Sequence, residues 1–252
     1  MGANKQGYQL VWSDEFNYEG APDLRKWNYD LGNHQWANRE LQAYTNRTEN
    51  VYVRDGKLTI KARKEQDGER EYTSTRLTTY DRQSWQYGLF EFSVKLPKGK
   101  GSWPAVWMLP DSIKKGIPWP DCGEIDIIEH SGRCQDQLFF SLHSKKHNHT
   151  RNDTKKYTVF QEYSGVSEEF HTYQMEWTPE AVEFYVDGES LCRFQKSDDP
   201  EDQTTAAWPF DQPFYLILNI AVGGSLGGEV AEEDLPFVME VDYVRVYQLS
   251  NE

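Results

Sequence analysis

Hydrophobic and polar residues alternate with a period of two along much of the chain. Between residues 57 and 63, Leu58, Ile60 and Ala62 alternate with lysine, threonine and arginine. The same alternation recurs over residues 90–96 and 172–177, whereas hydrophobic stripes with the helical period of 3.6 are nearly absent. This pattern predicts β-strands that bury one face and expose the other.

Turn signals predict how these strands are connected. Asp187-Gly188 separates two strand-like segments, and Asp55-Gly56 directly precedes the strand that contains Leu58. An Asp-Gly pair is typical of two-residue hairpins, so neighbouring strands are expected to run antiparallel. The uninterrupted apolar run from Phe214 to Val222 predicts a strand buried on both faces. Two stacked sheets provide such a position, and we therefore predict an all-β sandwich.

The length of the chain, 252 residues, favours one large domain. No internal repeat and no Pro/Gly/Ser-rich linker divides it, so we expect residues 8–250 to form a single domain, with residues 1–7 as linker or vector-derived residues. No run of eighteen apolar residues is present, which predicts no transmembrane segment. Residues 1–7 also lack the apolar stretch of a secretory signal.

Charge and aromatic content narrow the range of partners. The formal net charge of −14 repels polyanions, so nucleic acid is not an expected partner and a neutral substrate suits the chain better. Aromatic residues make up 14% of the chain and include 9 Trp. Core packing accounts for most of them, but exposed aromatic rings would also suit stacking against sugar rings.

Two further features of the composition bear on the structure. Cys122, Cys134 and Cys192 cannot all pair within one chain, and a bridge between Cys122 and Cys134 has no support beyond their spacing. The cysteines therefore leave the cellular compartment open. Residues 143–157 are rich in His, Lys, Asn and Thr, and are expected to form an exposed, mobile loop near the mouth of a cleft.

The strongest chemical signal is a cluster of acidic residues within a segment that otherwise reads as a buried strand. Glu124, Asp126 and Glu129 fall within six residues. About one such spacing is expected by chance in a chain this acidic, so the spacing alone is weak and the hydrophobic context makes it informative. Burying like charges together is costly, and a site that does so is a candidate for catalysis. A calcium site or a solvated acidic edge are the alternatives.

The spacing of these acids also predicts a local irregularity. Glu124 and Asp126 share one face of a regular strand, but Glu129 would point to the other face. A β-bulge around Ile127 and Ile128 would bring Glu129 back to the first face. Two carboxyl groups about 5–5.5 Å apart are what a retaining glycosidase requires. Asp126 would keep one glutamate ionised and raise the proton affinity of the other.

Aromatic residues and a histidine lie close to this segment in the sequence. Trp103, Trp107 and Trp119 precede the acids and could form platforms for sugar rings, although Trp107 also fits a core position. His143 lies on the next predicted strand, where it could orient a carboxylate.

The sequence resembles glycoside hydrolase family 16, in its laminarinase-like branch, over nearly its whole length. The matching segments are Trp12-Ser-Asp-Glu-Phe16, Asn33-His-Gln-Trp36 to Tyr44-Thr45, Asp55-Gly-Lys-Leu58, Tyr87-Gly88, Trp103 to Pro110, Gly123 to Glu129, Ala221-Val-Gly-Gly224 and Val241-Asp-Tyr-Val-Arg-Val-Tyr247. The resemblance implies a β-jelly-roll sandwich of two antiparallel sheets with a concave open cleft. It also implies that residues 8–250 are a catalytic domain for the retaining, endo-acting hydrolysis of β-1,3-glucan or mixed-linkage β-1,3-1,4-glucan.

The resemblance assigns roles to individual residues. Glu124 is similar to the nucleophile, Glu129 to the general acid/base, and Asp126 to the residue that hydrogen-bonds the nucleophile. The residues that resemble the glycone-side contacts are Asn50, Arg76, Trp103, Trp107, Trp119 and His143. Taken without the resemblance, Arg76 also fits a surface ion pair and Asn50 a turn residue.

No cofactor is implied for catalysis, but a structural calcium ion is. Its ligands would be the backbone carbonyls of Glu15 and Gly56 and the carboxylate of Asp242, an all-oxygen set remote from the cleft. The extra residue between Asp126 and Glu129 sets this sequence apart from the lichenase and transglycosylase branches, which use the unbulged spacing. A monomer that acts outside the cell or at its surface is expected, because polysaccharides are found there.

Three other functions remain open at this stage. An agarase or carrageenase is compatible with the bulged spacing, and the pairs Lys145-Lys146 and Lys155-Lys156 supply some positive charge, although the acidic chain argues against sulfated substrates. A non-catalytic β-glucan lectin would share the sandwich, but both glutamates are present here. A zinc site built from His143, His147 and His149 matches no familiar zinc spacing.

Overall fold

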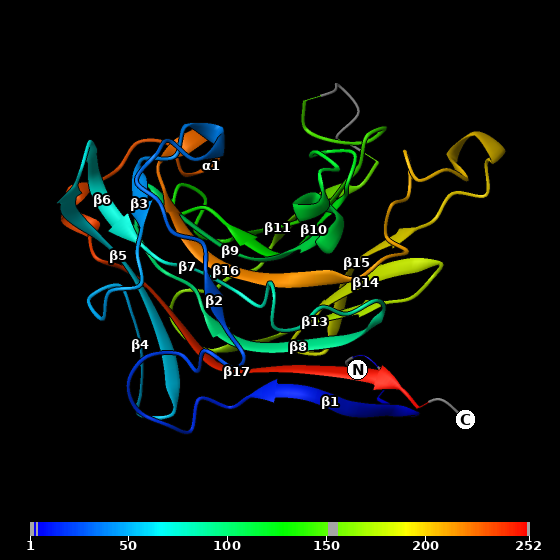
Figure 1. Cartoon of the computed structure of the whole chain (residues 1–252), viewed down its shortest axis with the longest axis horizontal. Helices are drawn as coiled ribbons and strands as arrows, with labels where there is room; N and C mark the ends of the chain where they lie inside the picture. Colours follow the sequence, from blue (N-terminus) through cyan, green and yellow to red (C-terminus); the bar gives the residue numbers. More distant parts are fainter. Residues whose placement is uncertain (1–2, 4, 151–155, 251–252) are drawn as a thin grey trace.

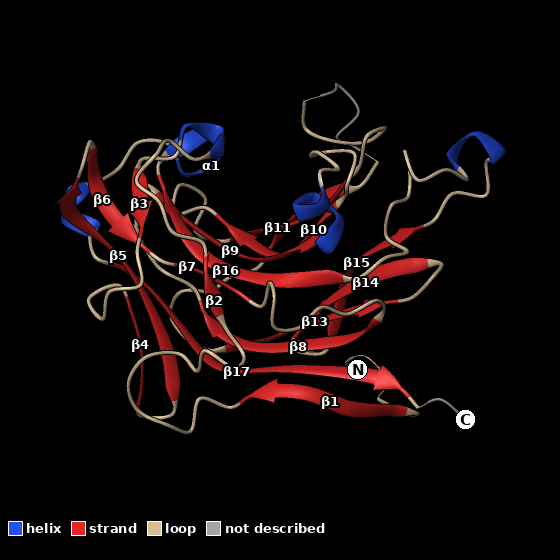
Figure 2. Ribbon diagram, viewed as in Figure 1, coloured by secondary structure: helices blue, strands red, loops and turns tan. Residues whose placement is uncertain are grey.

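The computed structural model describes residue 3, residues 5–150 and residues 156–250, and β-strands dominate it (Figure 2). Among these residues no helix is long and apolar enough to cross a membrane. The strands form two sheets that lie one above the other (Figure 1). This is the predicted all-β jelly-roll sandwich.

The first sheet, which we call the outer sheet, contains 10 of the described strands. Its order is β15-β14-β13-β8-β17-β5-β6-β3, with β1 paired to β17 and β4 paired to β5. The bounds are β1 (Tyr8–Asp14), β3 (Gln42–Tyr44), β4 (Val51–Arg54), β5 (Lys57–Asp67), β6 (Arg70–Ser74), β8 (Gly88–Lys95), β13 (His171–Trp177), β14 (Ala181–Val186), β15 (Glu189–Gln195) and β17 (Phe237–Leu249).

The second sheet, which we call the cleft sheet, contains 7 of the described strands in the order β12-β11-β10-β9-β16-β7-β2. The bounds are β2 (Asn28–Tyr29), β7 (Arg76–Thr78), β9 (Ser102–Pro110), β10 (Glu124–His130), β11 (Gln137–His143), β12 (Thr158–Glu162) and β16 (Phe214–Val222). All the pairs in this sheet are antiparallel, so side chains at paired positions share one face.

Helical segments are short and lie in the connections. The structure has one α-helix, α1 (Gly224–Gly227), within the described residues, together with the 3-10 turns η1 (Ala37–Arg39), η2 (Asp111–Lys115), η3 (Pro200–Asp202) and η4 (Glu232–Asp234). α1 and η1 contact each other at one end of the cleft sheet, where both project above the strands (Figure 1).

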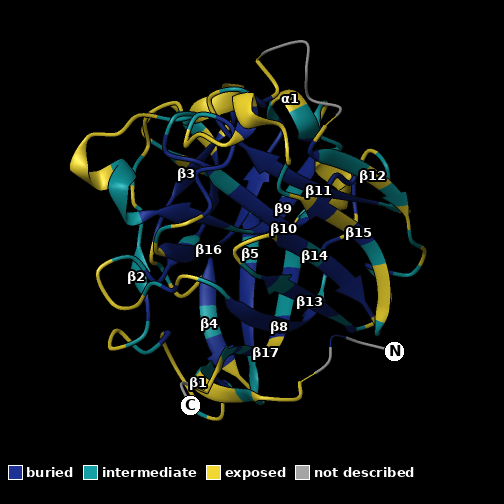
Figure 3. Ribbon diagram, turned by 90° about the vertical axis from the view of Figure 1, so that its right-hand side faces the viewer, coloured by how far each residue is buried: buried dark blue, intermediate teal, exposed yellow. Residues whose placement is uncertain are grey.

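A single large core fills the space between the sheets. Phe90, Phe92 and Val94 of β8 face it from the outer sheet, and Val106 and Met108 of β9 face it from the cleft sheet. Figure 3 shows these central strands as buried and the connecting loops as mostly exposed. Burial of a large apolar side chain contributes about 1.5–3 kcal/mol, so this layer is the main source of stability. It also makes a rigid floor for the exposed face of the cleft sheet.

The predicted hairpins and the buried strand are confirmed. Asp55-Gly56 joins β4 to β5 and Asp187-Gly188 joins β14 to β15. All four turn residues have positive φ, which the primed two-residue turns require. β16 is buried at every position. One pairing departs from the prediction, because β3 and β6 run parallel.

The prediction of an exposed loop over residues 143–157 is wrong for much of the part that is described. Ser144, His147 and Asn148 are at most 3% exposed, and Tyr157 is also buried. The Asn148 side chain donates to the Ser144 carbonyl, and Lys146 and Lys156 both pair with the buried carboxylate of Asp202. Asp202 is far away in the sequence, so local composition could not indicate its contacts with this segment. Residues 151–155 lie outside the described part of the chain.

All three cysteines are free thiols. Cys122 and Cys192 are buried, and Cys134 is partly exposed. The structure therefore contains no bridge between Cys122 and Cys134.

Candidate active site

The strand that carries the three acids contains the predicted bulge. Asp126 pairs with Trp107 of β9, and Glu129 pairs with Ala105. Three steps along β10 therefore match two steps along β9, which is one extra residue. Ile127 and Ile128 are both buried in the core, at 1% and 0% exposure. A regular strand would place Ile128 in the cleft and the Glu129 carboxylate in the core. The bulge avoids both costs and puts all three acids on one face.

The three acids line a common cleft over the cleft sheet. Glu124, Asp126 and Glu129 line a cavity of about 370 Å³ on the β11–β12 side and a second of about 300 Å³ on the β9–β16 side. Trp103 and Asn38 also line both cavities, so the two are parts of one cleft that crosses the strands. An open cleft of this kind suits a long chain that enters and leaves at both ends.

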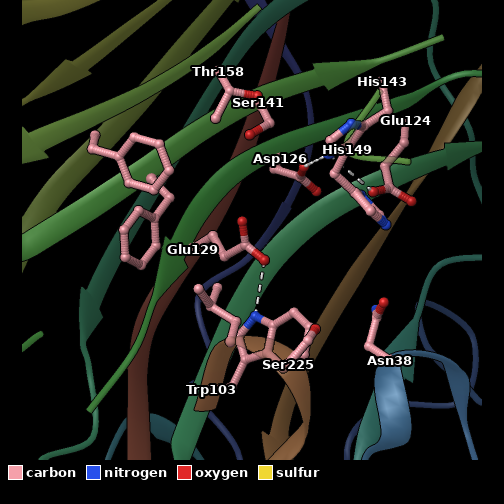
Figure 4. Close-up of a pocket in the computed structure, with 13 residues that line it drawn as sticks. Asn38, Trp103, Glu124, Asp126, Glu129, Ser141, His143, His149, Thr158 and Ser225 are labelled. Atoms are coloured by element: carbon pink, nitrogen blue, oxygen red, sulfur yellow. Dashed lines mark hydrogen bonds and ion pairs between the residues drawn. The ribbon is translucent and has the colours of Figure 1, made fainter. Parts of the chain in front are cut away.

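His143 holds the Glu124 end of the cluster. It pairs with Glu124 across the β10–β11 ladder, and its Nε2 lies 3.2 Å from Asp126 Oδ2 and 3.7 Å from Glu124 Oε1 (Figure 4). Its Nδ1 is buried with no hydrogen-bond partner among the described residues. Within the described part of the chain, the imidazole nitrogens therefore make polar contacts with the carboxylates alone, where the ring can stabilise negative charge.

Burial raises the pKa of all three acids. The pKa of Glu124 is raised first by burial and then by the charge of Asp126, while His143 acts in the opposite direction. Burial alone raises the pKa of Asp126. Burial also raises the pKa of Glu129 to about 8, and the charge of Asp126 adds to this effect. Three acids in one cleft cannot all ionise cheaply, and the two beside His143 are the ones whose negative charge is best compensated.

Glu129 has a different environment from the other two acids. Trp103 of β9 donates its indole N–H to Glu129 Oε1 over 2.8 Å, as Figure 4 shows. His143 is hydrogen-bonded or ion-paired to Glu124 and Asp126 but not to Glu129. Burial raises the pKa of Glu129 as it does that of Glu124, so the two glutamates are distinguished by their partners: Glu129 lacks the ion pair with His143, its negative charge is the less compensated, and it is the better placed to act as the acid.

The far end of the cleft is built around Arg76. Its guanidinium lies 5.3 Å from the Trp36 ring and 4.7 Å from the Trp107 ring, and its Nε is 3.1 Å from Asp30 Oδ2. The ion pair considered for Arg76 from the sequence is therefore present, but it lies in the lining of the cleft. Stacking and ion pairing together hold the two indoles in fixed positions.

A chain of hydrogen bonds runs beneath this end of the cleft. The Trp107 indole donates to Asn219 Oδ1 over 2.7 Å, and Asn219 Nδ2 donates to the Tyr44 hydroxyl over 3.0 Å. The Tyr44 hydroxyl donates in turn to Glu40 Oε2 over 3.2 Å. The pKa of Glu40 is raised, because the effect of burial outweighs that of the hydrogen bonds that Gln42 and Tyr44 donate to its carboxylate. Each member fixes the orientation of the next, which stiffens the lining.

Most of the predicted contact residues lie in the cleft, but Asn50 does not. Arg76, Trp103, Trp107, Trp119 and His143 line one or both cavities. Asn50 is 0% exposed, and its amide bonds to Thr45, Thr73 and the Lys61 carbonyl. The prediction that Asn50 contacts substrate is therefore wrong. Its side chain instead joins β5 to β6 and to the segment that follows β3.

Several residues of the cleft were not predicted individually. They are Asn38, Glu40, Tyr44, His149, Asn219 and Phe160. Asn38 has a φ of 60°, which points its side chain from η1 toward the acids (Figure 4). Polar residues in the Asn33–Thr45 segment and the lone polar residue in the apolar Phe214–Val222 run were the available signals.

The three histidines of the zinc alternative are not brought together. His143 and His149 have ring centroids 5.2 Å apart, but His147 packs against Tyr157 and lies near Asp202. Among the described residues, the only group of three His, Cys, Asp or Glu side chains close enough to hold an ion is Glu124, Asp126 and His143. Those residues belong to the carboxylate cluster.

The predicted calcium ligands lie on the outer sheet, away from the cleft. Asp242 is the extra residue at an irregularity of β17, between the positions that pair with Leu58 of β5 and Asp14 of β1. Its carboxylate is exposed and has no partner among the described residues, and the Glu15 side chain pairs with Arg245 at 2.7 Å. The Asp242 carboxylate is therefore free to bind a cation, and the calcium site formed with the carbonyls of Glu15 and Gly56 stays a prediction.

Comparisons with known proteins agree on one family. Residues 38–245 match the family model "Glycosyl hydrolases family 16". The chain is 48% identical over 247 residues to a beta-glucanase of Rhodothermus marinus, covering 96% of this chain and 85% of that protein. The structure is similar to the X-ray structure of the laminarinase from Rhodothermus marinus, with a TM-score of 0.92, 47% identity and coverage of 97% and 98%. The sequence of the chain is also 40% identical to that of glucan endo-1,3-beta-glucosidase A1 of Niallia circulans, covering 96% of this chain and 38% of that protein.

Proposed function

Because this chain belongs to glycosyl hydrolase family 16, we propose that it is a retaining, endo-acting hydrolase of β-1,3-glucan, of mixed-linkage β-1,3-1,4-glucan, or of both. The observation that carries the proposal is the bulge in β10, which places Glu124, Asp126 and Glu129 on one face of an open cleft. The relatives named beta-glucanase, laminarinase and glucan endo-1,3-beta-glucosidase support the choice of substrate.

In the first step, Glu124 is the nucleophile. Its carboxylate attacks the anomeric carbon, and the glycosidic carbon–oxygen bond breaks. The bonding electron pair goes to the leaving oxygen, which takes the proton of Glu129. The raised pKa of Glu129, about 8, keeps that proton in place at neutral pH. His143 lies 3.7 Å from Glu124 and 3.2 Å from Asp126, so its imidazole is placed to stabilise the carboxylate of the nucleophile.

In the second step, the covalent glycosyl-enzyme is hydrolysed. The ionised Glu129 takes a proton from a water molecule, whose oxygen attacks the anomeric carbon and releases Glu124. Two inversions leave the product in the β configuration. No step requires a cofactor.

Other features of the protein follow from this proposal. The residues proposed to contact the glycone are Arg76, Trp103, Trp107, Trp119 and His143, which lie over β7, β9 and the Glu124 end of the cluster. Residues 8–250 would form the catalytic domain, acting as a monomer outside the cell or at its surface. A calcium ion at Asp242 would stabilise the outer sheet without entering the reaction.

Hydrolysis of pure polysaccharides tests the substrate. Laminarin, barley mixed-linkage glucan, agarose and carrageenan are incubated separately with wild type and with Glu124→Ala, and reducing ends are measured. We expect release from one or both glucans by wild type and almost none by the variant. Release from agarose or carrageenan alone would overturn the choice of substrate. Equal, negligible release by both proteins on all substrates would favour a β-glucan lectin.

Product stereochemistry tests the mechanism. NMR early in the reaction should show the β anomer before mutarotation, since a double displacement retains configuration. Added azide should restore turnover of an activated aryl β-glucoside by Glu124→Ala with formation of an α-glycosyl azide, and by Glu129→Ala with formation of a β-glycosyl azide. The reverse assignment of the two azides would exchange the roles of the two glutamates.

A further inference from the structure

A row of directly paired residues crosses the cleft sheet from β7 to β12 at the level of Glu129. On one side of Glu129, the row continues through Ala105 of β9 and Asn219 of β16 to Arg76 of β7. On the other side it continues through Phe139 of β11 to Phe160 of the edge strand β12. Paired positions of antiparallel strands share a face, so the side chains of this row all point into the cleft.

The two ends of the row differ in whether a proposed glycone contact lies there. The Arg76 end is packed against Trp36 and Trp107 and is part of the proposed glycone side. The other end lines the cavity of about 370 Å³ over β10, β11 and β12, where His143 and Trp103 are the only proposed glycone contacts among the described lining residues. Strands are spaced about 4.8 Å apart, so β12 lies about 10 Å beyond β10, a reach comparable with two sugar rings.

Phe160 is far more exposed than the phenylalanine with which it pairs. It is 64% exposed, whereas its partner Phe139 is 3% exposed. The two rings meet edge to face with centroids 5.0 Å apart and an interplanar angle of 79°. Phe139 thus supports the Phe160 ring from the side and leaves its remaining surface to solvent. A fixed, exposed aromatic ring lining a cleft is a surface on which a sugar ring can stack.

A row of hydroxyl groups runs beside the aromatic pair. Asp126 pairs with Ser141 of β11, and Ser141 pairs in turn with Thr158 of β12. Both hydroxyl residues line the same cavity (Figure 4). Neither the Ser141 nor the Thr158 hydroxyl is hydrogen-bonded to any residue that the structure describes, although Ser141 is only 3% exposed. Apolar and hydroxyl-bearing rows side by side match the two surfaces of a sugar ring, its apolar face and its hydroxyl edge.

We propose that Phe160, supported by Phe139 and flanked by Ser141 and Thr158, forms an aglycone-side subsite that binds the leaving part of a β-glucan chain. The inference rests on the proposed function, because the glycone contacts assigned there do not include the end of the row at Phe139 and Phe160, which is left for the aglycone. Phe160 stacks on the sugar ring about two strands from Glu129, and the hydroxyls bind the ring edge. The chain is thereby held so that its glycosidic oxygen meets Glu129.

Two substrates that differ only on the aglycone side test this subsite. The first is a nitrophenyl β-glycoside of a β-1,3-linked glucan oligosaccharide, whose leaving group is the aryl ring alone. The second is a β-1,3-linked oligosaccharide long enough to fill both sides of the cleft. For Phe160→Ala we expect kcat/KM on the aryl glycoside to stay within twofold of wild type. On the oligosaccharide it should fall about 3- to 10-fold through a higher KM, as the loss of one aromatic stacking contact predicts. Phe160→Trp should restore it.

Leu10→Ala is the matched control, since Leu10 is 53% exposed on β1 of the outer sheet. It should leave both substrates unchanged. Equal losses on the two substrates with Phe160→Ala, or no loss on either, would overturn the subsite. A wild-type protein that hydrolyses neither these substrates nor their mixed-linkage β-1,3-1,4 counterparts would instead overturn the proposed function, and the subsite with it.

Discussion

Trp103 and Glu129 come from adjacent strands of the cleft sheet, and the indole N–H of Trp103 donates to the Glu129 carboxylate over 2.8 Å. A donor at this position favours the ionised carboxylate and so lowers the pKa that burial and Asp126 raise. The contact therefore partly offsets the effect of burial on the acid strength of the residue proposed to protonate the leaving group.

Trp103→Phe should therefore move the alkaline limb of the kcat/KM profile to higher pH. Without the N–H donor the pKa of Glu129 rises further above about 8, and the acid stays protonated over a wider range. A shift of roughly half a unit to one unit is expected from the loss of one hydrogen bond to a charged group. Trp107→Phe, whose indole donates to Asn219, is the control and should leave the limb in place. A downward shift for Trp103→Phe would contradict the assignment.

Glu129→Gln should stabilise the fold at alkaline pH. The pKa of Glu129 is raised in the folded state, so the folded protein holds a proton that the unfolded chain has already lost. Wild-type stability from this group is then full below about pH 4, falls as the pH rises, and levels off above about pH 8. Glutamine does not titrate, so the Tm advantage of the variant should grow across that window.

The expected gain at pH 8 is on the order of 1–3 kcal/mol. Thermal unfolding of wild type and variant from pH 4 to pH 9 measures it, with exposed Glu180→Gln as the control. A Tm difference that is constant with pH would show that Glu129 is not perturbed by burial.

Ile127→Ala and Ile128→Ala should destabilise the protein by similar amounts. Both side chains reach the core because the bulge lies between the positions that pair with Trp107 and Ala105. Each truncation is expected to cost about 2–4 kcal/mol in the free energy of unfolding. In a regular strand the two residues would face opposite sides, and one substitution would be nearly neutral. Chemical denaturation decides between these outcomes, with Ile125→Ala as the reference for a core position of β10.

Arg76→Lys should weaken substrate binding although the charge is kept. A lysine retains the attraction to Asp30 but cannot lie flat against both Trp36 and Trp107. We expect about a tenfold rise in KM for the hydrolysed glucan, corresponding to about 1.4 kcal/mol, with kcat nearly unchanged. Arg25→Lys, on an exposed ion pair with Asp23, provides the control. An unchanged KM would mean that the indoles keep their positions without the guanidinium.

Properties that depend on neighbours in the sequence could be predicted from it. The alternation around Leu58 and the Asp-Gly turns indicated strands and hairpins, because side-chain direction and turn geometry are set within a few residues. The spacing of Glu124, Asp126 and Glu129 indicated the bulge for the same reason, and the motif pattern indicated the family.

Properties that depend on pairing between distant strands were decided only by the tertiary structure. The register of β7, β16 and β9 brings Arg76 beside Trp107, and that of β11 and β12 brings Phe160 into the row of Glu129. Asn50 is buried, and the segment around His147 is packed against Asp202, for reasons of the same kind. Local pattern gives each side chain a face, but the free energy of packing two sheets selects its neighbours.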